Sequence, residues 1–225
     1  MLRSFRLLGF LAVLGVVPAR GAAQGTADAA PAIAPDSVAA RLLADVRSID
    51  TTIMVEVRYA TLNNFTGAVL PGYQANRALL RREAVVALAR VQRRLLSGGM
   101  GLKVFDGYRP VRATQAMVEW AERTGQRHLI DDGYIASHSR HNLGLAVDLT
   151  LVDWSMGGRE VDMGTPYDTF SEAAHYASAS GRTLRYRQLL RRMMEEEGFR
   201  QYEQEWWHYS YSVPGEPMAF DMVVR

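Results

Sequence analysis

The segment with the clearest chemical pattern runs from Ser139 to Leu151 and reads SRHNLGLAVDLTL. After Gly144 the apolar residues occupy every second position, which is typical of a strand with one face in a core. Asp148 then lies on the other face, where a carboxylate removed from water needs a compensating partner such as a metal ion. Gly144 permits a sharp bend that could bring His141 over the same face. The pattern indicates two metal ligands, His141 and Asp148, although two such residues are by themselves more often unrelated.

A second segment, EWWH at 205–208, supplies another histidine. Catalytic zinc sites commonly use three protein ligands and leave one position for water. His208 would complete a His, Asp, His set, and Glu205 is the nearest candidate for a general base. On a regular strand these two positions point to opposite faces, so one site can use both only where the backbone bends or the strand ends. Taken alone, the segment is better explained as an aromatic core strand with a hydrogen-bonded histidine.

The turn DGYRP at 106–110 carries an arginine directly after a predicted strand. Hydrolysis of an amide builds negative charge on the carbonyl oxygen, and a fixed guanidinium can stabilise that charge. Arg109 is therefore a candidate for this role. From this segment alone, an arginine that closes a turn or pairs with a surface acid is an equal alternative.

The composition limits the remaining chemistry. The chain has 225 residues, of which 48% are hydrophobic and 22% charged, as expected for one globular domain. It has no cysteine, which excludes disulfides and thiol nucleophiles and leaves His, Asp and Glu as metal ligands. No basic stripe is interleaved with aromatic residues, so we expect no nucleic-acid partner.

The N-terminus has the layout of a secretory signal peptide. Two arginines precede an apolar run over 7–17, and small residues follow at 21–23. Eleven apolar residues are few for a membrane span, so we expect cleavage near Ala23, no membrane span in the mature form, and a periplasmic or secreted protein. An uncleaved anchor is the alternative. Residues 1–23 hold three arginines and no acid, so their removal takes the formal net charge from +2 to about −1.

Several helices and strands must position the candidate residues. Period-two alternation predicts strands, at 53–59, 102–105, 145–151 and 205–211. Helical periodicity with a glycine after the last turn predicts helices, at 77–97, 112–124 and 182–196. Residues 24–40, rich in Ala and Pro, are expected to form a flexible linker before a domain at 41–225. Without a repeating βαβ unit, this order favours a single α+β domain with a mostly antiparallel central sheet flanked by helices.

Taken together, these segments resemble the VanX-type D-alanyl-D-alanine dipeptidases, a family of zinc peptidases related to the D,D-carboxypeptidases. The family pattern Ser-x-His-x-x-Gly-x-Ala-x-Asp is complete over 139–148, and Glu-x-Trp-His is complete over 205–208. The similarity extends to RYATLNNFTG at 58–67, the DGYRP turn and MGTPYD at 163–168. It therefore runs from about residue 45 to the C-terminus and implies a D,D-peptidase/hedgehog-like fold.

The resemblance also implies a role for each matched position. His141, Asp148 and His208 would bind one zinc ion per chain. Glu205 would act as base and then proton donor, and Arg109 would stabilise the transition state.

Three further residues are implied to contact a small dipeptide substrate. Asp168, the last residue of MGTPYD, looks like the carboxylate that receives the free amino group, and Tyr59 and Ser139 look like residues of the pocket. A carboxylate facing an ammonium would explain a preference for dipeptides with a free N-terminus. The structural alternatives are a turn-capping acid at Asp168 and a core aromatic at Tyr59.

The leading hypothesis is zinc-dependent hydrolysis of D-alanyl-D-alanine in the turnover of peptidoglycan-derived dipeptides. A D,D- or L,D-carboxypeptidase acting on stem peptides is the alternative, because the same machinery serves longer substrates. A zinc-bearing binding module without catalysis is a third possibility, and the presence of Glu205 and Arg109 weighs against it. The resistance enzymes of this type act in the cytoplasm, so export favours recovery of wall-derived dipeptides. The sequence does not indicate an oligomeric state.

Overall fold

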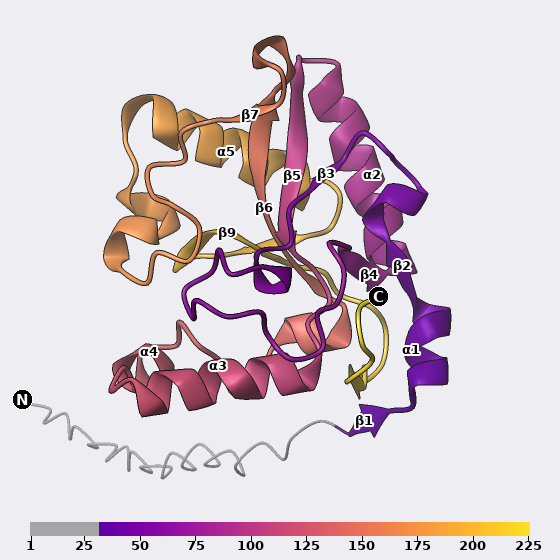
Figure 1. Ribbon diagram of the computed structural model, residues 1–225. Helices are drawn as coiled ribbons and strands as arrows, with labels where there is room; N and C mark the ends of the chain where they lie inside the picture. The colour runs from indigo at the N-terminus through magenta and orange to yellow at the C-terminus, as the bar shows by residue number, and fades with distance from the viewer. Residues whose placement is uncertain (1–31) are drawn as a thin grey trace, which may run out of the picture. The chain divides into compact units, whose positions relative to one another are not determined.

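The computed structural model describes residues 32–225, and the expected signal peptide lies outside this range. A six-stranded sheet with the order β3-β5-β6-β9-β8, on which β7 pairs with β6, forms its centre (Figure 1). Its strands are β3 (Met54–Val55), β5 (Met100–Asp106), β6 (Ala146–Asp153), β7 (Arg159–Glu160), β8 (Arg200–Tyr202) and β9 (Glu205–Ser210). Among them β3 and β5 pair in parallel and the other pairs are antiparallel. The expected α+β class with a mostly antiparallel sheet is confirmed.

Two long helices, α2 (Arg82–Leu96) and α5 (Gly181–Glu195), cover one face of this sheet (Figure 1). The first packs on β5, the second on β6 and β8, and the two helices contact each other. The apolar stripe of α2 is buried, including Val85, Leu88 and Leu95. Burial of each such side chain contributes about 1.5–3 kcal/mol, which fixes the helix to the sheet.

The central strand β6 follows the predicted alternation. Val147, Leu149 and Leu151 are fully buried and belong to the hydrophobic core. Asp148 lies between them and therefore points to the opposite side of the sheet. Packing of the apolar positions thus decides where the carboxylate faces.

Two predicted elements differ from the structure. The helix expected over 77–97 begins only at Arg82, because β4 (Leu79–Arg81) pairs with β2 (Leu43–Asp45). The strand expected over 53–59 is reduced to β3 and is followed by the 3-10 helix η2 (Arg58–Ala60). The chain leaves the sheet because the Asn76 side chain accepts from the amide of Val57 at 2.8 Å. The helix predicted over 112–124 is confirmed as α3 (Val111–Arg123), and that over 182–196 as α5.

Folded elements begin within the stretch expected to be a linker. β1 (Ile33–Ala34) pairs in parallel with β10 (Ala219–Phe220), and α1 (Asp36–Leu42) follows it. Ala34 and Ala39 are buried, so the small residues that indicated a linker serve here as close-packing residues. Two short helices complete the part that bears on the site, namely α4 (His128–Asp131) and the 3-10 helix η3 (Arg140–Leu143). From residue 32 onward, no helix has the length and apolar character needed to cross a membrane.

Candidate metal centre and active site

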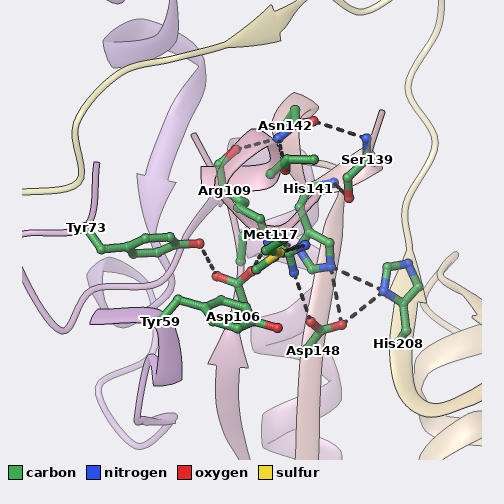
Figure 2. Close-up of polar contacts among 12 residues, drawn as sticks. Tyr59, Tyr73, Asp106, Arg109, Met117, Ser139, His141, Asn142, Asp148 and His208 are labelled. Carbon is green, nitrogen blue, oxygen red and sulfur yellow. Dashed lines mark hydrogen bonds and ion pairs between the residues drawn. The ribbon is translucent and has the colours of Figure 1, made fainter. Parts of the chain in front are cut away.

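The three predicted metal ligands converge where the start of β6 pairs with β9 (Figure 2). Asp148 and His208 are direct cross-strand partners in the antiparallel pair, so their side chains share one face. Nδ1 of His208 lies 3.0 Å from Oδ1 of Asp148. Nε2 of His141 lies 3.3 Å from the same oxygen and 3.2 Å from Nδ1 of His208.

The backbone at Gly144 delivers His141 to this face. Gly144 has φ 66°, a left-handed conformation that ends η3 and turns the chain into β6. A Cβ at this position would lie 2.4 Å from Cδ2 of Leu43. Ser139 caps the start of η3, where its hydroxyl accepts from the amide of His141 at 3.2 Å. The predicted bend is therefore confirmed, and it needs glycine for both conformation and space.

The donor set fits a zinc ion. Nδ1 of His141 donates to the carbonyl of Gly107 at 2.6 Å, which leaves Nε2 free of a proton and aimed at the other two ligands. The three converging atoms are 3.0, 3.3 and 3.2 Å apart. Ligands about 2.0–2.1 Å from a tetrahedral ion lie about 3.3 Å from one another, which matches this spacing. Two imidazole nitrogens and a carboxylate oxygen are also ligands that zinc accepts.

Glu205 lies beside this triad despite the opposite faces expected on a regular strand. Its Oε2 is 3.8 Å from Nδ1 of His208. The β8–β9 pairing is irregular here, since Gln201 pairs with Tyr209 while the next residue, Tyr202, pairs with Glu205. Three residues of β9 therefore bulge between the two paired positions. This is the backbone bend that the sequence required for a shared site.

Burial and charge perturb the acids of the site. Burial, followed by the charges of Asp148 and Asp168, raises the pKa of Glu205 well above its ordinary value. Although burial acts in the opposite sense on Asp148, its histidine neighbours hold the pKa of that carboxyl well below the usual range. Burial lowers the pKa of His208. The arrangement separates an ionised ligand, Asp148, from a carboxyl with strong affinity for a proton, Glu205.

Arg109 is held rigidly on the opposite side of Asp148 (Figure 2). Its Nε donates to Oδ2 of Asp106 at 2.9 Å, and one of its terminal nitrogens lies 3.6 Å from Oδ2 of Asp148. The guanidinium also stacks on the ring of Tyr59, 4.9 Å from the centroid. Asp106 is completely buried and accepts a second hydrogen bond from Tyr73 at 2.7 Å. The alternative of pairing with a surface acid is therefore wrong, whereas Arg109 does bond within its own turn, to the buried Asp106.

Asp168 and Tyr59 meet on the far side of the site. The Tyr59 hydroxyl donates to the Asp168 carboxylate, with distances of 3.0 and 3.2 Å to its two oxygens. Tyr167 connects this pair to the triad, because its hydroxyl lies 3.0 Å from that of Tyr59 and 2.9 Å from Oδ2 of Asp148. Burial, and then the charge of Asp148, raises the pKa of Asp168 to about 8.

A cavity of about 250 Å³ lies at this site. Every candidate site residue predicted from the sequence lines it, namely Tyr59, Arg109, Ser139, His141, Asp148, Asp168, Glu205 and His208. His138 also lines the cavity, although it fell on no motif position. The sequence also suggested no role for Asp106 and Tyr167, which hydrogen-bond to Arg109 and Asp148. Both residues lie inside matched motifs, DGYRP and MGTPYD, but the motifs do not indicate which residues they contact.

Comparison with known proteins agrees with this geometry. The model of the family described as Peptidase_M15, D-ala-D-ala dipeptidase, matches residues 39–222. The D-alanyl-D-alanine dipeptidase of Enterococcus faecium is 36% identical over 169 residues, which cover 68% of this chain and 83% of that protein. Those of Streptomyces coelicolor and Escherichia coli are each 34% identical, covering 73% and 74% of this chain and 89% and 83% of their own. The chain therefore belongs to the D-Ala-D-Ala dipeptidase family of M15 peptidases.

Proposed function

We propose that this protein is a zinc-dependent dipeptidase that hydrolyses D-alanyl-D-alanine. The observation that carries the proposal is the arrangement of one cavity. The candidate ligand triad lines this cavity together with Glu205, Arg109 and Asp168. Family membership and the named activity of the relatives support the same reaction.

In this proposal His141, Asp148 and His208 hold one zinc ion. Zinc supplies Lewis-acid chemistry, which polarises a carbonyl and makes water acidic enough to react near neutral pH. The hydrogen bond from His141 to Gly107 keeps the ligating nitrogen unprotonated and the ring correctly turned.

The surrounding side chains share the remaining work. Glu205 takes a proton from the attacking water at its carboxylate and gives it to the departing amine. Its raised pKa suits both transfers, because a carboxyl that holds a proton more tightly is the better base and can still act as an acid near neutral pH. Arg109, immobilised by Asp106, presents fixed positive charge to the oxygen that becomes negative.

Asp168 binds the free amino group of the dipeptide. An ionised carboxylate is a strong acceptor for an ammonium group, and the hydrogen bond from Tyr59 keeps it oriented. A substrate whose amino group is acylated loses this interaction and adds bulk beside a buried acid. The site thus favours a dipeptide over a longer stem peptide.

The experiment compares turnover of D-Ala-D-Ala, N-acetyl-D-Ala-D-Ala and the L,D and L,L dipeptides by zinc-loaded protein. We expect D-Ala-D-Ala to be cleaved fastest and the acetylated form to be cleaved about tenfold to a hundredfold more slowly, as for a lost charged hydrogen bond. Equal turnover of the acetylated form would favour a D,D-carboxypeptidase. Zinc binding without any hydrolysis would favour a non-catalytic binding module.

We also propose that the protein is exported and recovers dipeptides released from peptidoglycan. The support is the N-terminal pattern of arginines, an eleven-residue apolar run and small residues. N-terminal sequencing of the mature protein, with fractionation of cells, tests this. Cleavage near Ala23 and recovery outside the cytoplasm are expected, and an intact Met1 in the cytoplasmic fraction would contradict export.

A further inference from the structure

The loop that presents Asp168 has little regular structure of its own. This segment, residues 163–176, is called the Asp168 loop, and between Met163 and the start of η6 (Tyr176–Ser178) it contains only the three-residue turn η5 (Glu172–Ala174). Asp168 has φ 59°, a left-handed conformation unusual for a residue with a side chain. Such a conformation costs about 1–3 kcal/mol and persists only where the surroundings hold it.

Arg187 of α5 supplies contacts that hold this loop. Its side chain is 1% exposed, and its Nε donates to the carbonyl of Met163 at 2.9 Å. Its terminal nitrogens donate at the other end of the loop, to the carbonyl of His175 at 2.5 Å and that of Ala173 at 3.3 Å. One guanidinium therefore ties the two ends of the Asp168 loop together and to the helix.

Two neighbouring contacts show that the loop is built against this arginine. Gly164 approaches so closely that a Cβ there would lie 2.9 Å from Cγ2 of Thr183 and 3.1 Å from a terminal nitrogen of Arg187. The next residue, Thr165, accepts from the indole nitrogen of Trp206 at 2.8 Å. The loop is thus attached to α5 and to β9, the strand that carries His208.

The hydrogen bonds of Arg187 require the several nitrogens of a guanidinium group. No Asp or Glu of the described residues lies within ion-pair distance of it, and its hydrogen bonds go to backbone carbonyls. A buried charge without a counter-ion is a poor device for stability alone, because an apolar side chain could fill the same space. Lysine has a single ammonium and cannot reach carbonyls at both ends of a loop.

We infer that Arg187 is a positioning residue for recognition of the substrate's amino group. By clamping both ends of the Asp168 loop it keeps Asp168 in its left-handed conformation, with the carboxylate on Tyr59 and facing the cavity. Arg187 touches no group of the metal centre, so its effect reaches the reaction through Asp168. This inference rests on the proposed function only for the part that concerns substrate binding.

The first test measures the loop itself and needs no activity. In hydrogen–deuterium exchange, Arg187→Lys should exchange at least about tenfold faster than wild type in peptides covering 163–176, because charge-assisted hydrogen bonds there are lost. Arg185→Lys is the matched control. Arg185 is exposed on the same helix, two residues before Arg187, and makes no hydrogen bond or ion pair with the described part of the loop. Unchanged exchange at 163–176 in Arg187→Lys overturns the clamp.

A second variant covers the case in which Arg187→Lys does not fold. Gly164→Ala leaves the arginine in place but crowds it and Thr183, so it should give the same local increase in exchange. If Gly164→Ala folds and its loop exchanges as in wild type, the clamp is likewise overturned.

The second test is a double-mutant cycle on D-Ala-D-Ala hydrolysis. Arg187→Lys and Asp168→Asn should each raise KM about tenfold or more, with zinc content retained and kcat changed far less. The double variant should be no worse than Asp168→Asn, because the clamp acts only through that carboxylate. Effects that multiply would show general damage and overturn the inference. Wild-type protein without activity would instead overturn the proposed function, and the exchange result would still decide the clamp.

Discussion

Oε2 of Glu205 lies 3.8 Å from Nδ1 of His208, although the two residues are three positions apart on one strand. A regular strand would direct them to opposite faces. The bulge of β9 against Gln201 and Tyr202 removes this conflict and places the Glu205 carboxyl, whose pKa burial raises, beside a candidate metal ligand. The site's chemistry therefore depends on a local irregularity of the sheet, and each of its parts can be tested separately.

Removal of the carboxyl at Glu205 should separate catalysis from metal binding. Glu205→Ala is expected to lower kcat by about 10²–10⁴-fold, the usual contribution of a general acid–base group, while zinc remains bound. Steady-state kinetics with elemental analysis of the same preparation measure both quantities. Near-normal turnover in this variant would refute the assignment.

Loss of a ligand should have the opposite signature. His208→Ala removes one of three donors, so zinc per chain measured by elemental analysis after dialysis should fall well below that of wild type. The control is His128→Ala, since His128 is exposed on α4. Full zinc occupancy in His208→Ala would show that the ion is held elsewhere.

Arg109 should affect kcat and leave zinc in place. Arg109→Lys keeps the charge but loses the planar contact with Asp106, so kcat should fall by about 10²–10³-fold, as for removal of a fixed oxyanion donor. Arg112→Lys serves as the control, because Arg112 pairs with Asp221 at the surface, 2.7 Å away. Equal, small losses of activity in both variants would contradict the role of Arg109.

Substrate binding should depend on pH through Asp168. Its pKa is raised to about 8 by burial and then by Asp148, so the carboxyl carries a proton below that pH and a charge above it. The substrate amine, with an ordinary pKa of about 8, binds best as an ammonium facing a charged carboxylate. KM should therefore fall as the pH rises from about 6 to 8, and rise again once the amine loses its proton.

The control for this profile is Asp168→Asn. It should show a raised KM that stays flat over the lower part of the range, measured beside wild type in the same buffers. A wild-type KM that does not change between about pH 6 and 8 contradicts the role of Asp168.

Gly144 should contribute to stability as well as to ligand placement. Gly144→Ala forces a side chain into a left-handed position and toward Leu43, so the free energy of unfolding should drop by about 1–3 kcal/mol or more. Gly157→Ala is a matched control, with φ 70° but no atom within 4 Å of its Cβ. Urea denaturation of both variants measures the free energy of unfolding. The difference between the two losses gives the cost of crowding Leu43, and equal losses would exclude a packing role for Gly144.

The types of chemical group, and most of the elements that carry them, followed from the sequence alone. Complete motifs at 139–148 and 205–208 pointed to three candidate ligands and a candidate base, and the structure brings these residues together. The helices α3 and α5 lie within one residue of their predicted ranges. These features depend on spacing within one segment and on helical or strand periodicity, which are local properties of a chain.

Only the tertiary structure decided how the parts meet. The bulge that brings Glu205 to His208 depends on pairing with another strand. The hydrogen bond between Tyr73 and the buried Asp106, and the tie of Arg187 to the Asp168 loop, join positions distant in sequence. The early end of β3 also depends on a residue distant in sequence, because the Asn76 side chain accepts a hydrogen bond from the backbone amide of Val57. Hydrogen bonds and burial between distant segments leave no periodic trace in the sequence, so they become visible only when the chain has folded.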